Sequence, residues 1–264
     1  MRICVFGAGA VGGHLAARLA AIGRHEVSVI ARGAHLEAMR SHGLALRHGE
    51  EEIRARVHAV ESADEAGAQD AVFVTLKATA LGAFAAAASP LLGRDTAVVF
   101  VQNGIPWWYA IGLSSSRPAP PDLSRLDPDG ALARAIAPER IVGGVVYSAN
   151  ELVAPGVVFN RTPGNNMLTL GEPDDSSSGR IVSLRALLEA VGMSSPATAD
   201  IRQAVWNKLA LNISSACMTV LTGEPLSRAR SDPALRPVVE ALREEARSIA
   251  RAHGIVPEGA PERP

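Results

Sequence analysis

The 264-residue sequence has few cysteines, few aromatic residues and almost no net charge. Its two cysteines, Cys4 and Cys217, each lie in an apolar stretch, so we interpret them as small buried residues rather than as a disulfide. Aromatic residues make up 4% of the chain, and the formal net charge is −1. Because nucleic acids and anionic membranes bind to basic patches, this charge balance argues against both as main partners.

Long apolar runs are missing as well. No stretch of the sequence has the length of a membrane-spanning helix, and glycines interrupt the N-terminal region where a secretory signal would be uniformly apolar. We therefore expect a cytoplasmic protein. The composition, 47% hydrophobic and 20% charged, is that of an ordinary globular enzyme with one large domain or two moderate ones.

The chain begins with an apolar strand, a glycine-rich turn and a helix. The strand is predicted over residues 2–6, and residues 7–12 read Gly-Ala-Gly-Ala-Val-Gly. Gly7 permits a tight turn, Gly9 lets a pyrophosphate approach the backbone, and Gly12 allows helix and strand to pack closely. The pattern predicts a dinucleotide site, with a bare glycine turn as the alternative. The predicted cofactor-binding residues here are Gly7, Ala8, Gly9, Ala10, Val11 and Gly12.

The end of the next strand indicates which dinucleotide binds. Residues 26–31 form an apolar strand that is followed by Arg32. About twenty residues beyond the glycines, an NAD enzyme usually has an acidic residue that binds the ribose 2′-hydroxyl, whereas a cation suits the 2′-phosphate of NADP. We therefore predict NADP (NADPH) as the cofactor. A solvated arginine at the end of a strand is the alternative.

Two more apolar strands are followed by polar residues. Residues 70–76 precede Lys77, and residues 96–101 precede the sequence Gln-Asn-Gly that contains Asn103. Ligands of an open parallel sheet bind beyond the carboxyl ends of its strands. Arg32, Lys77 and Asn103 are therefore predicted to converge on one site. The alternative is that each merely ends a strand, and that Asn103 with its following glycine marks a turn.

The rest of the first region alternates between strands and helices. Its Pro- and Ser-rich residues 113–130 are predicted to form an extended surface loop. The neighbouring cluster Trp107-Trp108-Tyr109 is interpreted as packing for this loop, with a wall of the substrate cleft as the alternative. The other predicted elements are helices over 33–42, 78–89 and 176–191, a hairpin of 44–47 with 53–60, and strands over 141–147, 156–160 and 167–170.

A helical region begins near residue 200. Apolar residues at four-residue spacing predict an amphipathic helix over 200–214, and Lys208 and Asn212 flank its apolar stripe one turn apart. Lys208 is interpreted either as a catalytic residue or as a lysine that merely extends from the edge of the apolar face into solvent. A last helix is predicted over 233–254, with Asp232 as its N-cap. Its predicted buried residues are Leu235, Val238, Val239, Leu242 and Ile249.

Four of these motifs occur in one order along the chain. They are Gly7–Gly12, Thr75–Ala78, Gln102–Gly104 and Trp206–Asn212. Together they resemble the ketopantoate reductase (2-dehydropantoate 2-reductase) family. That family reduces a branched 2-keto acid with NADPH in pantothenate biosynthesis, so the resemblance implies the same oxidoreductase activity here. The implied fold class is α/β, with an N-terminal Rossmann-like doubly wound sheet over 1–199 and an all-α C-terminal domain over 200–264.

The resemblance also implies roles for the residues that match the family's motifs. The glycine-loop residues, Arg32, Lys77 and Asn103 resemble contacts to NADPH, and Ser148 falls at a backbone contact to the cofactor. Lys208 matches the family's proton donor. Asn212 matches a residue that hydrogen-bonds the substrate, and Asn103 also lies near the reacting carbonyl. No metal is implied.

Two departures from the family bear on the substrate. Ala216-Cys217 stands where the family commonly has a second asparagine followed by proline. The family's later helices, with a serine for the substrate carboxylate and a glutamate near the site, would lie beyond Pro264, so the C-terminal domain is expected to be truncated relative to the family. The alternatives are a related NADP-dependent keto-acid or hydroxy-acid dehydrogenase and a non-catalytic NADP-binding protein. The expected partner is a small 2-keto acid, and a homodimer is left open.

Overall fold

A seven-stranded, mostly parallel sheet forms the centre of the protein. In the computed structural model, which describes residues 1–258 apart from the side chains of residues 226, 229 and 230, the strand order is β11-β8-β7-β6-β1-β2-β5. Neighbouring strands pair in parallel except β11, which runs antiparallel to β8. The strands are β1 (Arg2–Phe6), β2 (Glu26–Ile30), β5 (His58–Val60), β6 (Gln69–Val74), β7 (Leu92–Phe100), β8 (Ile141–Tyr147) and β11 (Met167–Gly171).

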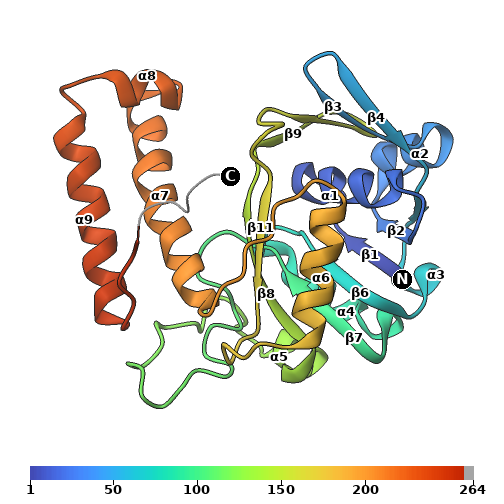
Figure 1. The fold of residues 1–264 in the computed structure, drawn as a ribbon, viewed down its shortest axis with the longest axis horizontal. Helices are drawn as coiled ribbons and strands as arrows, with labels where there is room; N and C mark the ends of the chain where they lie inside the picture. Colours follow the sequence, from blue (N-terminus) through green and yellow to red (C-terminus); the bar gives the residue numbers. More distant parts are fainter. Residues whose placement is uncertain (259–264) are drawn as a thin grey trace.

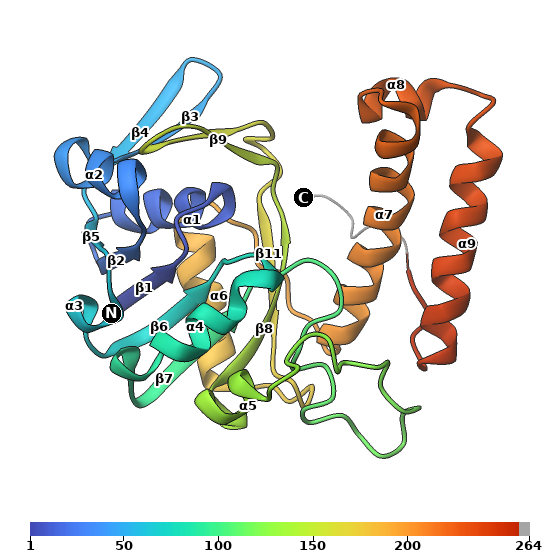
Figure 2. The ribbon, with the colours of Figure 1, turned by 180° about the vertical axis from the view of Figure 1, so that it is seen from behind.

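Helices cover both faces of this sheet (Figures 1 and 2). One face packs against α1, α2 and α6, and the other against α3, α4 and α5. The strands are therefore buried on both sides, which explains their continuous apolar runs. These helices are α1 (Ala10–Ala21), α2 (Gly33–His42), α3 (Ala63–Ala66), α4 (Leu81–Ala87), α5 (Ala131–Ala135) and α6 (Gly179–Ala190), with short 3-10 turns η1 (Ala78–Ala80), η2 (Ser89–Leu91) and η3 (Pro138–Arg140).

A second sheet of four strands, in the order β4-β3-β10-β9, packs against α1. The predicted hairpin of 44–47 with 53–60 is wrong in its second half. Only β4 (Glu51–Ala55) pairs with β3 (Leu44–His48), whereas residues 58–60 join the large sheet as β5. An alternating pattern predicts a strand but not the partner with which it pairs. The predicted strand 156–160 is β10 (Val157–Asn160), and its partner β9 (Asn150–Ala154) was not predicted.

The long connection between β7 and α5 contains turns but neither helix nor strand. This agrees with the surface loop predicted over 113–130. Trp107, Trp108 and Tyr109 are buried, with exposed fractions of 7%, 1% and 2%. Tyr109 packs with Leu123 of the loop, whereas Trp107 stacks edge-on against Phe100 of β7. Tyr109 therefore helps to pack the loop onto the protein, as the first interpretation of the cluster stated, and the two tryptophans belong to the core beside the sheet.

Within residues 1–258, three helices follow α6, and α7 and α9 lie side by side next to the sheet domain (Figure 1). They are α7 (Ile201–Thr222), α8 (Leu226–Ser231) and α9 (Arg236–Ala252). Asp200 caps α7 by accepting hydrogen bonds from the backbone N–H groups of Arg202 and Gln203. Ile201 packs against Gly143 and Gly171, where a Cβ atom would lie 2.8 Å from its side chain. The start of α7 is thereby fixed to the central sheet.

The last helix differs from its prediction in its start and in two of its five predicted buried residues, whereas Val239 is buried and Leu235 and Leu242 are partly buried as expected. It begins at Arg236, and Asp232 instead accepts a hydrogen bond from the Ala234 N–H in the preceding turn. Val238 and Ile249, predicted to be buried, are 44% and 47% exposed. The reason is that α9 lies at the edge of the molecule and packs through one narrow stripe. Among the helices within residues 1–258, none is long and apolar enough to cross a membrane.

Candidate active site

The glycine-rich loop connects β1 to α1 and leaves room for a phosphate group. Gly7 has a φ of +105°, a conformation that favours glycine. A Cβ atom at Gly12 would lie 2.1 Å from the Gly7 carbonyl oxygen and 2.3 Å from Thr75 Oγ1, so the loop and helix can approach this closely only with glycine. Within residues 1–258, no heavy atom outside Ala8, Gly9 and Ala10 lies within 4 Å of a Cβ position at Gly9, the N-cap of α1. Open space at a helix N-terminus suits phosphate binding.

The three predicted polar residues follow three parallel strands, β2, β6 and β7, at the same edge of the sheet. Arg32 is the N-cap of α2, Lys77 is the N-cap of η1, and Asn103 follows β7; all three are exposed. Gln102 Nε2 donates a hydrogen bond of 2.7 Å to the carbonyl oxygen of Val74, which ties the ends of β6 and β7 together. The strand ends therefore present these side chains beside the glycine-rich loop.

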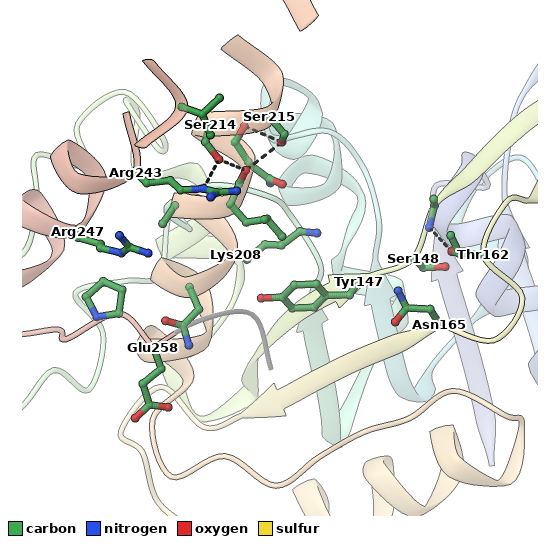
Figure 3. A pocket seen from close by; sticks show the side chains of 17 residues that line it. Tyr147, Ser148, Thr162, Asn165, Lys208, Ser214, Ser215, Arg243, Arg247 and Glu258 are labelled. Atoms are coloured by element: carbon green, nitrogen blue, oxygen red, sulfur yellow. Dashed lines mark hydrogen bonds between the residues drawn. The ribbon is translucent and has the colours of Figure 1, made fainter. Parts of the chain in front are cut away.

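Lys208 extends from α7 toward the end of β8. Its Nζ atom lies 4.1 Å from the centre of the Tyr147 ring, a cation–π contact (Figure 3). Burial lowers the pKa of the Lys208 ammonium and raises the pKa of the Tyr147 hydroxyl to about 12. The helical region thus places an ammonium group at the carboxyl edge of the sheet, where sequence reasoning predicted the proton donor.

A cavity of about 640 Å³ surrounds this contact. It brings together three predicted residues, Ser148, Lys208 and Asn212, but the glycine-rich loop, Arg32, Lys77 and Asn103 are not part of its lining. Those residues lie at the neighbouring strand ends. The polar and charged side chains that line the cavity are Tyr147, Ser148, Thr162, Asn165, Asn207, Lys208, Asn212, Ser214, Ser215, Arg243, Arg247 and Glu258.

Two arginines of α9 line the same cavity and were missed by sequence reasoning. Arg243 contacts Ser214 Oγ at 3.4 Å and forms an ion pair of 2.8 Å with Glu240. Arg247 is 40% exposed, and its ion pair with Glu244 is long, at 3.7 Å. Their spacing of four residues puts both on one side of α9, yet the sequence does not show that this side faces α7. Tyr147 was also missed, because the sequence does not show that α7 packs beside the end of β8.

A network of buried amides holds the corner that follows β8. Ser148 Oγ donates to Asn166 Oδ1 at 2.5 Å and accepts from Asn150 Nδ2 at 2.7 Å. Asn160 and Asn166 are 1% and 5% exposed, and the Asn160 amide donates to Asn166 Oδ1 at 2.9 Å. Because satisfied buried polar networks are rigid, the backbone at Ser148 is held in one position.

Comparison with known proteins gives the family. Residues 3–112 match "Ketopantoate reductase PanE/ApbA", and residues 200–263 match "Ketopantoate reductase PanE/ApbA C terminal". The curated 2-dehydropantoate 2-reductase of Mesorhizobium japonicum is 41% identical over 97% of this chain and 77% of its own length. The chain belongs to the ketopantoate reductase family. The family to which the four sequence motifs point is therefore confirmed, and the chain is an oxidoreductase of the 2-dehydropantoate 2-reductase type.

Solved structures share the fold of this chain. The 2-dehydropantoate 2-reductase of Geobacter metallireducens has a TM-score of 0.81 at 26% identity, covering 99% of this chain and 79% of that one. D-mandelate dehydrogenase, solved with NADH and anilino(oxo)acetate, has a TM-score of 0.77 at 19% identity, covering 98% and 76%. The predicted α/β fold class, with its Rossmann-like sheet and helical C-terminal region, is confirmed. The roles of individual site residues remain predictions.

Proposed function

We propose that this chain reduces 2-dehydropantoate (ketopantoate) to pantoate with NADPH, in the cytoplasmic synthesis of pantothenate. The observation that carries the proposal is the Lys208 ammonium, which reaches from α7 over Tyr147 at the carboxyl edge of the sheet. The relatives named 2-dehydropantoate 2-reductase support the choice of substrate. Cys4 and Cys217 are both free, which suits a reducing compartment. We retain residues 1–199 as the dinucleotide domain and residues 200–264 as the substrate domain, of which 259–264 lie outside the described residues.

The glycine-rich loop and the strand ends would hold the dinucleotide. The loop offers the N–H groups at the start of α1 to the pyrophosphate, with Gly9 as the point of closest approach. Arg32 and Lys77 would bind phosphate charges, and Arg32 is assigned to the 2′-phosphate. The rigid backbone at Ser148 and the side chain of Asn103 would border the nicotinamide. When bound, NADPH supplies the hydride that reduces the keto carbon.

Lys208 would donate the proton that completes the reduction. The carbonyl oxygen gains negative charge as the keto carbon is reduced, and a nearby ammonium both stabilises this charge and protonates the alkoxide. Burial lowers the pKa of Lys208, which makes its ammonium a better acid than a solvated lysine. Asn212, one turn along α7, and Asn103 would hydrogen-bond the substrate oxygens and fix the carbonyl in place.

The carboxylate of the keto acid would bind toward the arginines of α9. Arg243 and Arg247 line the cavity together with Lys208, whereas Glu258 is its one acidic lining residue among the described residues. The excess of cations favours an anionic substrate. Arginine binds carboxylates through two parallel hydrogen bonds, so a site of this kind also orients the acid.

The decisive experiment measures oxidation of NADPH by the purified protein with ketopantoate, beside pyruvate and oxaloacetate. We expect the highest kcat/KM with ketopantoate. A clear preference for another 2-keto acid would assign the enzyme to that substrate, as the departure at Ala216-Cys217 allows. Binding of NADPH without oxidation by any of the acids would contradict the proposed reaction and leave a dinucleotide-binding protein.

A further inference from the structure

His35 connects the glycine-rich loop to the second sheet. It lies in the first turn of α2, half-buried between the loop and the turn that joins β9 to β10. Its Nε2 atom lies 2.7 Å from the carbonyl oxygen of Ala8, and its Nδ1 atom accepts a hydrogen bond of 2.7 Å from the Gly156 N–H. Neither the motifs of the sequence nor the proposed reaction uses this residue.

These two contacts define the chemical form of the imidazole. Nδ1 must be unprotonated because it accepts from a backbone N–H, so the donor to the Ala8 carbonyl must be Nε2–H. Burial lowers the pKa of His35, which agrees with a neutral ring. The turn at Gly156 is itself fixed: Gly156 has a φ of +74°, and its carbonyl oxygen accepts from the Ala45 N–H at 2.8 Å. His35 is therefore attached to a rigid base.

The contact to Ala8 sets the direction of a neighbouring N–H group. In a trans peptide the C=O and the N–H point in opposite directions. The Ala8 carbonyl points toward His35, so the Gly9 N–H of the same peptide points away from it. Within residues 1–258 no acceptor is found for that N–H, and the space beside the Gly9 Cα is open.

We propose that His35 is a positioning residue for the dinucleotide, which orients the Ala8–Gly9 peptide so that the Gly9 N–H faces the pyrophosphate. This inference rests on the dinucleotide binding in the proposed function. Because the peptide plane is already fixed before binding, no conformational entropy is lost there when the dinucleotide binds. The hydrogen bond from the Gly9 N–H then contributes fully to the binding free energy. A peptide that is free to rotate would also turn the Ala8 carbonyl, an electron-rich group, toward the phosphates.

Two substitutions separate the contacts of His35. Asparagine at this position places its amide near Nδ1, so His35→Asn retains the contact to Gly156 and loses the one to Ala8. Glutamine is one carbon longer and reaches the Ala8 carbonyl with its amide N–H, so His35→Gln retains the contact that the proposal requires. His42→Asn is the matched control, because His42 is exposed in the last turn of the same helix.

The test is a fluorescence titration of each full-length variant with NADPH, together with its thermal unfolding without ligand. We expect His35→Asn to raise the Kd about tenfold, the loss of one hydrogen bond to a charged group. His35→Gln is expected to stay within about twofold of the unmodified protein, as is His42→Asn. With saturating NADPH and ketopantoate, kcat of His35→Asn is expected to be unchanged, since the residue does not touch the reacting atoms.

Several results would overturn the proposal. The first is an equal Kd for NADPH in His35→Asn and the unmodified protein. The second is equally weak binding of NADPH by His35→Asn and His35→Gln. The third is failure of His35→Asn to fold, which would show that His35 is required for folding and not for binding. Failure of the unmodified protein to bind NADPH would overturn the proposed function and this inference with it. Binding that follows the expected order, without turnover of ketopantoate, would support the role of His35 and refute only the choice of substrate.

Discussion

At the scale of single residues, the two lysines of the chain stand out against its arginines. The sequence contains 24 arginines and only two lysines, Lys77 and Lys208, and both were predicted to belong to the site. Arginine carries a positive charge but does not release its proton in proteins, whereas lysine does when burial lowers its pKa. This chain therefore uses arginine for nearly all of its cations, and we propose that Lys208 is a lysine because it transfers a proton.

Lys208→Arg should consequently fail in turnover although it keeps the positive charge. We expect kcat with ketopantoate to fall by about 10²–10⁴-fold in both Lys208→Arg and Lys208→Ala, because neither side chain can act as the acid. The Kd for NADPH, measured by titration, should not change and serves as the control for folding. Full turnover by Lys208→Arg would show that charge alone is required at this position.

The same assignment predicts the pH dependence of the reduction. Only the ammonium form of Lys208 donates a proton, so kcat/KM should be high below the pKa of Lys208 and fall as the pH rises through it. Because burial lowers this pKa, the fall should be centred below the ordinary lysine value of about 10.4. The residual activity of Lys208→Arg should not show this alkaline fall. A rate that rises over the same pH range would contradict proton donation by Lys208.

Arg32 and Arg24 provide a matched pair for the choice of cofactor. Arg32 follows the carboxyl end of β2, whereas Arg24 precedes its amino end, and both are exposed. Arg32→Asp should shift the ratio of kcat/KM values from NADPH toward NADH, because aspartate repels the 2′-phosphate and accepts from a 2′-hydroxyl. Arg24→Asp makes the same change of charge at the opposite edge and should leave the ratio unchanged. Equal ratios in the two variants would remove Arg32 from the 2′-phosphate site.

At the scale of elements, the sequence was informative wherever a pattern is local. The buried parallel strands, the glycine-rich loop and the start of α7 follow from apolar runs, turn residues and caps. The errors concern partners: residues 53–60 divide between two sheets, and α9 leaves Val238 and Ile249, two of its five predicted buried residues, exposed. The same limit applies to the site, since Tyr147 and Arg243 enter it only through the way that α7 and α9 pack.

The N-terminal end of α7 depends on a buried arginine. Arg202 is 0% exposed and donates to the carbonyl oxygens of Tyr109, Ile111 and Pro173 at 2.6–2.9 Å. Its guanidinium also lies 3.7 Å from the carboxylate of Asp175. It therefore joins the long loop after β7 to the helix that carries Lys208.

Arg202→Met should lower the free energy of unfolding by about 3–5 kcal/mol, because methionine fills part of the space but leaves the carbonyls without this donor and removes one charge partner of Asp175. Urea unfolding measures this change. Arg228→Met, at a side chain that is 76% exposed, should change the stability by less than about 0.5 kcal/mol. Similar losses in the two variants would show that the buried network contributes little.

At the scale of the whole molecule, the proposed site requires that two regions of the chain meet. The sheet contributes the glycine-rich loop and the strand ends, and the helical region contributes Lys208, Asn212 and the arginines of α9. The contact of Lys208 with Tyr147 joins them directly, since Tyr147 ends β8 and Lys208 belongs to α7. Within the sheet domain, the Tyr147 ring is the group that contacts the Lys208 ammonium.

Tyr147→Phe and Tyr147→Ala therefore test how the two regions cooperate. Phenylalanine keeps the ring and should retain kcat/KM for ketopantoate within about twofold, whereas alanine removes a cation–π contact of about 1–2 kcal/mol and should lower kcat/KM roughly tenfold. If both variants lose activity equally, the hydroxyl of Tyr147 rather than its ring is required. Because burial raises the pKa of that hydroxyl to about 12, it would then act as a neutral hydrogen-bond donor to the substrate. Either result would show that the sheet contributes to the chemistry through Tyr147, whereas unchanged kcat/KM in both variants would show that it does not.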